Sequence, residues 1–225
     1  MIKRGVSLFF ISLLSITFLF GQEIITADQY LTSVSDNYAS IKDYEAAIEI
    51  RQGSSTMAGT VSHLAPSFMR IDFTRPAEQV IVFNGETLIV YLPEYRAVLN
   101  QPLNQTGRAG NMASAQGLSM LKRNYVPSFV TGPNPEPLES GSSERVVKLR
   151  LTRRNVSEGF REIILNINPT TKLIRRIEAR TIADTELRFD FSNIRINQGI
   201  PVARFAYDTP GTASMYNNFL FRDFD

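Results

Sequence analysis

Apolar and polar residues alternate with a period of two along most of this chain, and this pattern constrains the fold more than any other feature. In residues 44–51, apolar side chains at every second position alternate with Glu45, Glu49 and Arg51. A period of two places alternate side chains on opposite faces of a β-strand. Similar runs recur at residues 57–61, 69–73, 78–83, 87–92, 95–100, 147–152, 163–167, 173–180, 187–191 and 205–207. The pattern predicts a mainly antiparallel sheet of about ten or eleven strands.

The connection between residues 78–83 and 87–92 is the best-defined turn. It contains Asn84-Gly85, the preferred pair for a tight hairpin because both residues tolerate the backbone angles that the turn requires. The two flanking runs carry apolar side chains on both faces, and no catalytic side chain follows the turn. A single sheet of the predicted size must curl to bury its apolar face.

Two segments have helical rather than strand periodicity. Residues 27–41 read as an amphipathic helix that starts with a capping box, Thr26 and Gln29. Between residues 101 and 124, apolar side chains recur at spacings of three and four, which predicts a short helix or two pieces split near Gly117. These helices are available to cover the concave side of the sheet. Residues 131–143 are rich in Pro, Gly and Ser and predict a flexible loop.

The first 21 residues have the pattern of a secretory signal peptide. Lys3 and Arg4 provide a basic start, and residues 6–20 carry no charge. We expect cleavage after Gly21 and a single domain over residues 22–225; the alternative is a retained N-terminal membrane anchor. Cleavage would leave 22 of the 24 basic residues against 22 acidic ones. A net charge of zero gives no general attraction to nucleic acid or to anionic membranes.

The sequence offers little catalytic or metal-binding chemistry. It contains no cysteine, which excludes disulfides, thiolate metal sites and a lipid-bearing cysteine. Its one histidine, His63, lies in a predicted strand, and the chain has neither a G-x-S-x-G motif nor a phosphate-binding glycine motif. Asp184, Glu186 and Asp190 are spaced along one strand and fit a solvated face, as do the arginines of the second half. We therefore expect no catalytic residue, no metal site and no cofactor.

The apolar rows have two interpretations. In the first, they pack against the helices as an ordinary core, which is the usual role of aliphatic stripes. In the second, the sheet is larger than two short helices can fill, and the remaining concave surface is a ligand cavity. Four methionines, adaptable side chains that occur in such cavities and also in ordinary cores, are Met57, Met69, Met112 and Met120.

Two stretches resemble a known family. Residues 65–98, APSFMRIDFTRPAEQVIVFNGETLIVYLPEYRAV, contain a proline, an apolar strand and the Asn-Gly hairpin. Residues 189–213, FDFSNIRINQGIPVARFAYDTPGTA, read as a closing strand pair. In order and spacing, together with the export pattern and the first helix, they resemble the LolA-type outer-membrane lipoprotein carriers of bacterial periplasms over most of residues 1–213.

The resemblance implies an unclosed, strongly curved antiparallel β-barrel, mainly β with an α cover, whose short helices enclose an apolar cavity. It also implies a monomeric periplasmic carrier rather than an enzyme. Such a carrier accepts the acyl chains of lipoproteins from an inner-membrane transporter and delivers them to the outer membrane or to an acceptor there. Each exposed methylene costs about 0.8 kcal/mol in water, so acyl chains need a carrier. The alternatives are a carrier of the same fold for a glycolipid or phospholipid, and an envelope-stress sensor module.

The resemblance and the alternation together give candidate site residues. We expect the cavity to be lined by Ile48, Met57, Met69, Ile71, Phe73, Ile89, Tyr91, Leu165, Phe189 and Phe191. Alternation alone leaves open whether Ile89 and Tyr91, or Leu88 and Val90, face this cavity. Residues 108–124 are the expected lid region, with Met112, Leu118 and Leu121 as its apolar contacts.

The chain departs from the family pattern at one position. Where the carriers place an arginine that latches the lid, directly before the proline matched by Pro66, this chain has Ala65. Either another residue provides the latch, or the lid is less tightly gated, or the cargo differs. Residues 214–225, SMYNNFLFRDFD, have no clear counterpart in the family, and we expect this aromatic tail to pack against the sheet edge.

Overall fold

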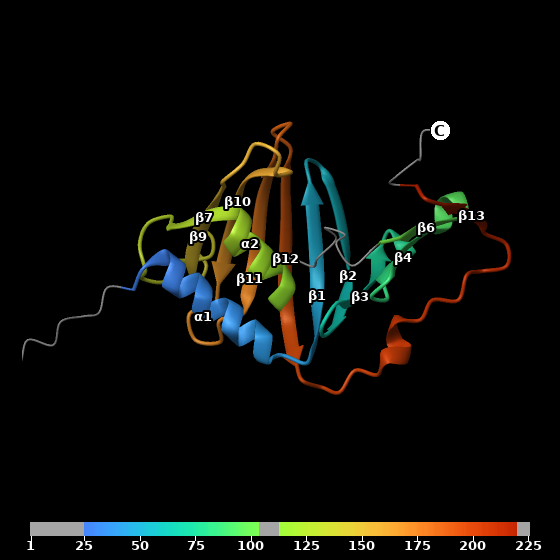
Figure 1. Ribbon diagram of the computed structural model, residues 1–225, viewed down its shortest axis with the longest axis horizontal. Coiled ribbons are helices and arrows are strands. Elements are labelled where there is room, and N and C mark those ends of the chain that lie inside the picture. Colours follow the sequence, from blue (N-terminus) through green and yellow to red (C-terminus); the bar gives the residue numbers. More distant parts are fainter. Residues whose placement is uncertain (1–24, 104–112, 220–225) are drawn as a thin grey trace, which may run out of the picture.

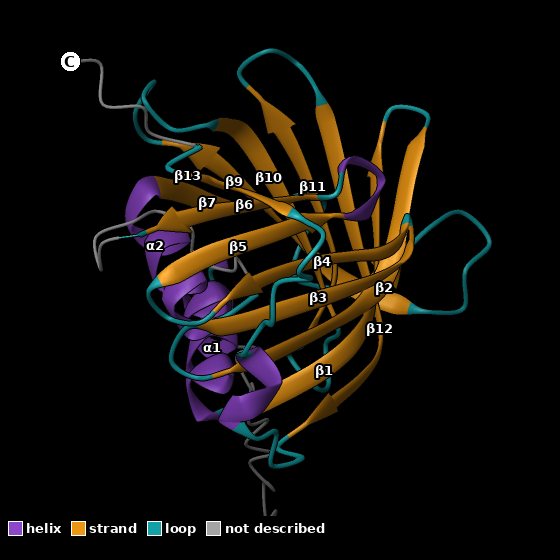
Figure 2. Cartoon of the chain, turned by 90° about the vertical axis from the view of Figure 1, so that its right-hand side faces the viewer, coloured by secondary structure: helices purple, strands orange, loops and turns teal. Residues whose placement is uncertain are grey.

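The computed structural model describes residues 25–103 and 113–219, which form one curled sheet with two helices on its concave side (Figures 1 and 2). The sheet has 13 strands in the order β13-β6-β5-β4-β3-β2-β1-β12-β11-β10-β9-β7, with β8 paired to β9. Because β13 and β7 end this order, the barrel is unclosed, and the predicted fold class is confirmed. The elements are α1 (Ala27–Ser40), β1 (Asp43–Gln52), β2 (Ser55–Leu64), β3 (Phe68–Arg75), β4 (Ala77–Phe83), β5 (Thr87–Leu92), the 3₁₀-helix η1 (Pro93–Tyr95), β6 (Ala97–Pro102), α2 (Ala115–Asn124), β7 (Tyr125–Phe129), β8 (Glu136–Pro137), β9 (Arg145–Arg153), β10 (Phe160–Ile167), β11 (Ile174–Thr181), β12 (Glu186–Ile196), the 3₁₀-helix η2 (Val202–Phe205) and β13 (Ser214–Asn217).

Both helices begin at polar caps. The capping box of α1 is present, because Gln29 N donates to Thr26 Oγ1 (3.2 Å) and Thr26 N donates to Gln29 Oε1 (2.8 Å). In α2, Ser114 accepts a hydrogen bond from Gly117 N (3.1 Å), and the helix continues through Gly117 without a break. Residues 104–112, which include Met112 and the start of the expected lid region, lie outside the described residues.

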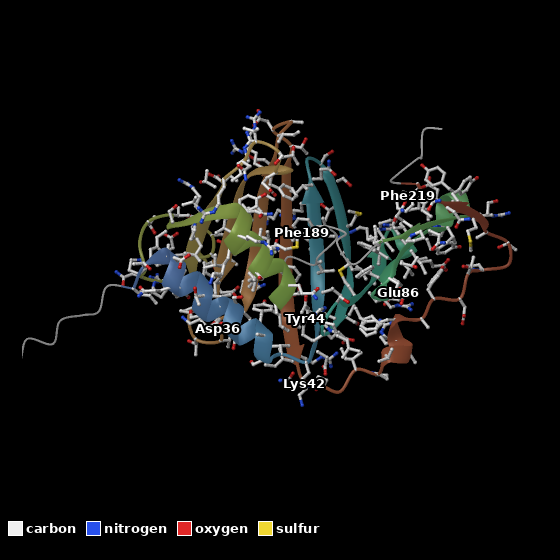
Figure 3. The ribbon with its side chains drawn as sticks, viewed as in Figure 1. Asp36, Lys42, Tyr44, Glu86, Phe189 and Phe219 are labelled. Carbon is white, nitrogen blue, oxygen red and sulfur yellow. The ribbon has the colours of Figure 1, made fainter. Side chains whose placement is uncertain are left out.

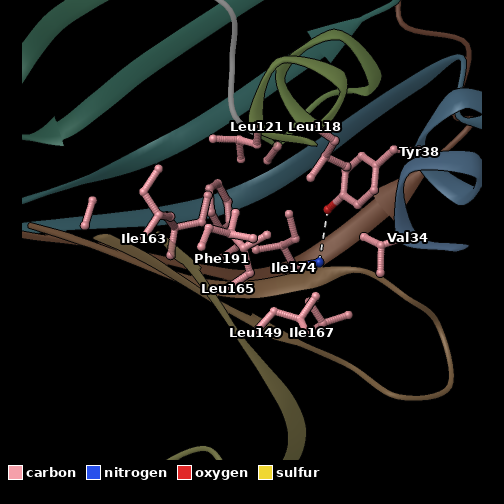
Figure 4. Packing of buried hydrophobic residues seen from close by; sticks show 14 of the residues in the cluster. Val34, Tyr38, Leu118, Leu121, Leu149, Ile163, Leu165, Ile167, Ile174 and Phe191 are labelled. Carbon is pink, nitrogen blue, oxygen red and sulfur yellow. Dashed lines mark hydrogen bonds between the residues drawn. The ribbon is translucent and has the colours of Figure 1, made fainter. Parts of the chain in front are cut away.

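The two helices bury one end of the concave face (Figure 4). Leu118 and Leu121 of α2 lie over Phe191 and Ile163, and α1 contributes buried side chains of its own. The core cluster continues across β9, β10 and β11, where Leu149, Leu151, Ile163, Leu165, Ile167 and Ile177 are at most 1% exposed. Burying each such side chain contributes about 1.5–3 kcal/mol, so this end of the sheet is the main core of the domain.

After β12 the chain crosses to the convex side as a strap, which we define as residues 197–217 (Figures 1 and 2). It contains η2 and ends in β13, which pairs in parallel with the edge strand β6. The prediction of a strand at residues 205–207 is wrong. Alternation arises there because the Phe205 and Tyr207 rings both pack on the convex face, next to Phe68 (5.5 Å between centroids) and Tyr91 (6.0 Å). The expected packing of the tail on a sheet edge is confirmed for residues 214–217.

Residues 131–143 are more structured than their composition predicts. They include β8, and Leu138 is buried. Glu139 accepts hydrogen bonds from Arg176 Nη2 (2.5 Å) and Arg188 Nη2 (2.6 Å) on the convex side of β11 and β12. These contacts join residues far apart in the sequence, so the local excess of Pro, Gly and Ser did not reveal them.

Candidate functional site

The register of the sheet decides which side chains face inward, because opposed residues in paired strands lie on the same face. One inward row passes from Val61 to Ile71, Ile81, Val90 and Leu99 across strands β2 to β6. A neighbouring inward row contains His63, Met69, Phe83 and Leu88. Ile48 and Phe191 are paired on the same face, as are Ile50 with Met57 and Gly59 with Phe73.

Two predicted cavity residues are on the wrong face. Ile89 is paired with Val82, and Tyr91 stacks near Tyr207 of the strap, so both side chains lie on the convex side. Leu88 and Val90 take the inward positions on β5. The assignment of Ile89 and Tyr91 to the cavity is therefore corrected. Their apolar character comes from cover by the strap, a contact between distant segments that alternation within one strand cannot show.

The concave face has two parts that differ in burial. Beneath the helices the side chains are fully buried, and Leu165, a predicted cavity residue, is 0% exposed and belongs to this closed core. Across β2 to β6, Val61, His63, Ile71 and Phe73 are buried, whereas the other large apolar side chains of the inward rows are only half-buried. We call this second part the concave wall; it consists of Met57, Met69, Ile81, Phe83, Leu88, Val90 and Leu99. An apolar surface left half-buried on a curved sheet is the expected surface for an apolar ligand.

The other predicted cavity residues lie where the two parts meet. Ile48, Ile71, Phe73 and Phe191 are buried in the core cluster, and Phe189 is half-buried beside it. In Figure 3, Phe189 is near the middle of the molecule, between the helices and strands β3 to β6. The structure thus places these residues next to the concave wall.

The helix α2, the described part of the expected lid region, is fastened to α1. Lys122 Nζ donates a hydrogen bond to Thr32 Oγ1 (2.7 Å), and Leu118 and Leu121 are buried beneath the helix. The helix α1 is itself fixed to the sheet, because Tyr38 Oη accepts a hydrogen bond from Ile174 N (3.0 Å). A link between the helices is therefore present in this chain without the arginine that the family places at Ala65.

A cavity of about 360 Å³ lies on the other side of α2. Its apolar lining comes from Met120, Leu121, Tyr125, Phe160 and Ile163, and its polar lining includes Asn124, Ser157 and Glu158. This volume is at the lower end of the range for small-ligand sites. The helix α2 thus has ligand-sized apolar space at its side in addition to the concave wall.

His63 is a buried polar residue of the concave face. Burial lowers the pKa of His63 and outweighs the opposing effects of the Phe68 carbonyl, 2.8 Å from Nδ1, and of the Asp43 charge. The His63 ring lies 5.1 Å from that of Tyr44. Among residues 25–103 and 113–219, no group of His, Asp and Glu side chains could hold a metal ion. Neither α1 nor α2 could span a membrane.

A second apolar cluster, on the convex face, explains why the Asn84-Gly85 hairpin is apolar on both sides. Val82 and Val98 are at most 1% exposed, and neither belongs to the core cluster of the concave side. The strap covers this face with Phe205 and Tyr207. An ion pair fixes the same segment, because Arg204 binds Asp72, and Arg70 Nη1 donates to the carbonyl of Ala206 (2.9 Å). Sequence reasoning missed this cluster.

An open, curled sheet with two helices on its concave side defines an unclosed half-barrel. Residues 49–115 match the model of the family described as outer membrane lipoprotein carrier protein LolA. An outer-membrane lipoprotein carrier protein of Bordetella avium (strain 197N) is 24% identical over 185 residues, which cover 81% of this chain and 83% of the relative. A protein of the same description from Dechloromonas aromatica (strain RCB) is 21% identical over 175 residues, 77% of this chain and 78% of the relative.

The solved structures agree on the fold. An uncharacterized conserved protein from Thermus thermophilus superposes with a TM-score of 0.56 at 14% identity, over 85% of this chain and 98% of that one. This likeness concerns the fold alone. The sequence matches support a LolA-type family for this chain, and they confirm the resemblance seen in its sequence.

Proposed function

We propose that this protein is a periplasmic carrier that holds the acyl chains of lipoproteins against its concave wall and shuttles them from the inner to the outer membrane. The observation that carries the proposal is the difference in burial along one continuous concave face. Under the helices the face is closed, whereas the wall from Met57 to Leu99 is half-buried and apolar. The relatives, named outer-membrane lipoprotein carrier proteins, support the same class of cargo.

The energetics favour a site of this kind. An acyl chain loses about 0.8 kcal/mol of stabilisation for every methylene that it exposes to water, so a chain of ordinary length requires an apolar surface in transit. The wall offers shape and apolar contact with little hydrogen-bonding specificity, and its two methionines, Met57 and Met69, can repack around different chains. Release then requires a change of environment and no covalent step, which fits a binding protein and not an enzyme.

The lid in this proposal is α2. Ligand that enters between α2 and the concave wall would contact Phe189, which is half-buried, and would reach Leu118 and Leu121, which are buried, once α2 moves. The Lys122–Thr32 hydrogen bond would keep α2 against α1 in the closed form. Because a single hydrogen bond from a charged group contributes only about 1.5–3 kcal/mol, it can hold the lid and still allow it to open.

The test is cargo recovery from cells. The native full-length chain is expressed, the mature protein is purified from the periplasm, and bound molecules are identified by mass spectrometry. We expect triacylated lipoprotein to copurify, and we expect added protein to release lipoprotein from spheroplasts. A variant with Val90→Asp on the concave wall should lose both activities. The matched variant Ile89→Asp, which changes the neighbouring convex position, should keep them.

The outcomes separate the possible cargoes. Extraction of a glycolipid or phospholipid in place of lipoprotein would keep the carrier fold and refute the lipoprotein assignment. Recovery of no lipid and no release from spheroplasts would refute the carrier function altogether. Delivery through an inner-membrane transporter and an outer-membrane acceptor is tested separately, by adding outer membranes to the loaded carrier and measuring transfer.

A further inference from the structure

The last strand of the strap, β13, differs from the other strands in how it is held. Ser214–Asn217 pairs in parallel with β6, whereas the other paired strands of the described sheet are antiparallel. All four of its residues are exposed, with Met215 at 53% and Tyr216 at 55%. Parallel pairing is slightly weaker per residue than antiparallel pairing. Little buried apolar surface therefore holds β13 in place.

The firm anchors of the strap lie upstream of β13. Phe205 is 1% exposed against Phe68, Arg204 binds Asp72, and Tyr207 lies beside Tyr91. Residues 208–213 follow and form a turn of their own, in which Ala213 N donates to the carbonyl of Pro210 (2.9 Å). The strand β13 can therefore leave β6 while the upstream part of the strap stays attached to the convex face.

The edge of β6 under β13 carries specific recognition chemistry. Ser214 N donates to the carbonyl of Arg96 (2.8 Å), and Asn218 N donates to that of Asn100 (2.9 Å). The side chains add a matched pair, because Asn100 Nδ2 donates to Asn217 Oδ1 (2.9 Å). Tyr216 is paired with Leu99, the last residue of the concave wall. An occupant of this edge thus needs a free extended backbone, an aromatic side chain and a carboxamide one residue later.

We propose that the β6 edge is a docking site for an uncharged, extended segment of a partner protein, and that β13 is its intramolecular stand-in. The partner segment would add to the sheet in the orientation of β13, with an aromatic side chain opposite Leu99 and a carboxamide beside Asn100. Until a partner arrives, β13 covers an edge that would otherwise pair with unrelated strands. The inference concerns the sheet edge that adjoins the concave wall at Leu99, and it does not depend on which ligand the wall holds.

The test uses the full-length mature protein and a fluorescent peptide with the sequence of residues 211–219, GTASMYNNF. Ser214→Pro removes the backbone donor to Arg96 and weakens the stand-in. We expect this variant to bind the peptide about tenfold more tightly than the wild-type protein. The reason is that β13, which competes with the peptide for the edge, has lost roughly one hydrogen bond. A peptide with Leu at the position of Asn217 should bind more weakly, because Leu has a similar shape but cannot accept the hydrogen bond from Asn100 Nδ2.

A reversible lock provides the control. The chain has no cysteine, so Asn100→Cys with Asn217→Cys creates one disulfide across the β6–β13 pair. Peptide binding should disappear in the oxidised protein and return on reduction, with a lower affinity than wild type because the contact of Asn100 is lost. For each single variant, the affinity should be the same under oxidising and reducing conditions. Equal binding to the oxidised and reduced lock would overturn the proposal. Dimerisation of Ser214→Pro without peptide binding would also overturn it, because the edge would then accept a second copy of the chain.

Discussion

The strap is expected to stabilise the domain mainly through one side chain, Phe205. Its ring is 1% exposed and lies 5.5 Å from the ring of Phe68. Replacing a buried Phe with Ala costs about 3–5 kcal/mol. Arg204 and Tyr207 keep their own contacts, and the surface segment can partly relax, so we expect Phe205→Ala to lower the free energy of unfolding by about 3 kcal/mol. For about 200 residues this corresponds to a fall in Tm of roughly 6–12 °C.

Urea unfolding followed by circular dichroism measures this loss. The matched control is Val202→Ala, which removes a side chain from the same 3₁₀-helix at a position that is 60% exposed. It should change the free energy of unfolding by no more than about 0.5 kcal/mol. If the Phe205 variant lost less than about 1 kcal/mol, or no more than the control, the strap would not be a packed part of the fold.

Three further predictions concern the helix anchor, the sheet and the buried histidine. Tyr38→Phe leaves Ile174 N without its partner and should lower the free energy of unfolding by about 1–3 kcal/mol in urea titrations. Gly59→Ala should abolish folding or cost more than about 3 kcal/mol, because a Cβ atom there would lie 2.2 Å from the carbonyl oxygen of Asp72; the yield of folded protein measures this. The free energy of unfolding should fall as the pH drops from 7 to 5, because the pKa of His63 is lower in the folded protein than in the unfolded chain. The unfolded chain therefore takes up the proton first, below about pH 6.5. Each pH unit between the two pKa values corresponds to a loss of about 1.4 kcal/mol. His63→Gln should remove this part of the pH dependence in urea titrations.

The first two of these predictions have matched control variants. Asn37→Ala removes a hydrogen bond to Thr171 from the exposed side of the same helix as Tyr38 and should have a small effect. Gly159→Ala adds a Cβ atom with no neighbour within 4 Å and should fold normally. An unchanged pH dependence after His63→Gln would show that other groups cause it. Normal folding of Gly59→Ala would contradict the close approach of β2 and β3.

The period-two pattern predicted most strands because half-burial of a sheet is a local property of the sequence. It placed Met69, Ile71 and Phe73 together on the inward face, as observed. It failed where both faces are covered. In the hairpin, Leu88 and Val90 and their neighbours Ile89 and Tyr91 are all apolar, and only the register with β4 shows which pair faces inward.

Contacts between distant segments account for the other differences. Residues 205–207 alternate like a strand because Phe205 and Tyr207 both reach the same convex cluster. The segment around Leu138 is ordered by Arg176 and Arg188, which come from strands much later in the chain. For Leu165, alternation gave the correct face, but burial by the helices made it a core residue. Such outcomes depend on packing between elements, which no local pattern encodes.

The central claim is that the concave wall, and not the convex face, contacts the acyl chains of a lipoprotein. The most direct measurement introduces a photo-crosslinking residue at Val90 or at Ile89, neighbours on β5 that face opposite sides of the sheet. Cells that make each variant are irradiated, and the crosslinked lipoprotein is detected with a labelled acyl chain. We predict a strong crosslink from position 90 and little from position 89. Equal crosslinking from both positions, or none from position 90 in a folded and exported variant, would contradict the account.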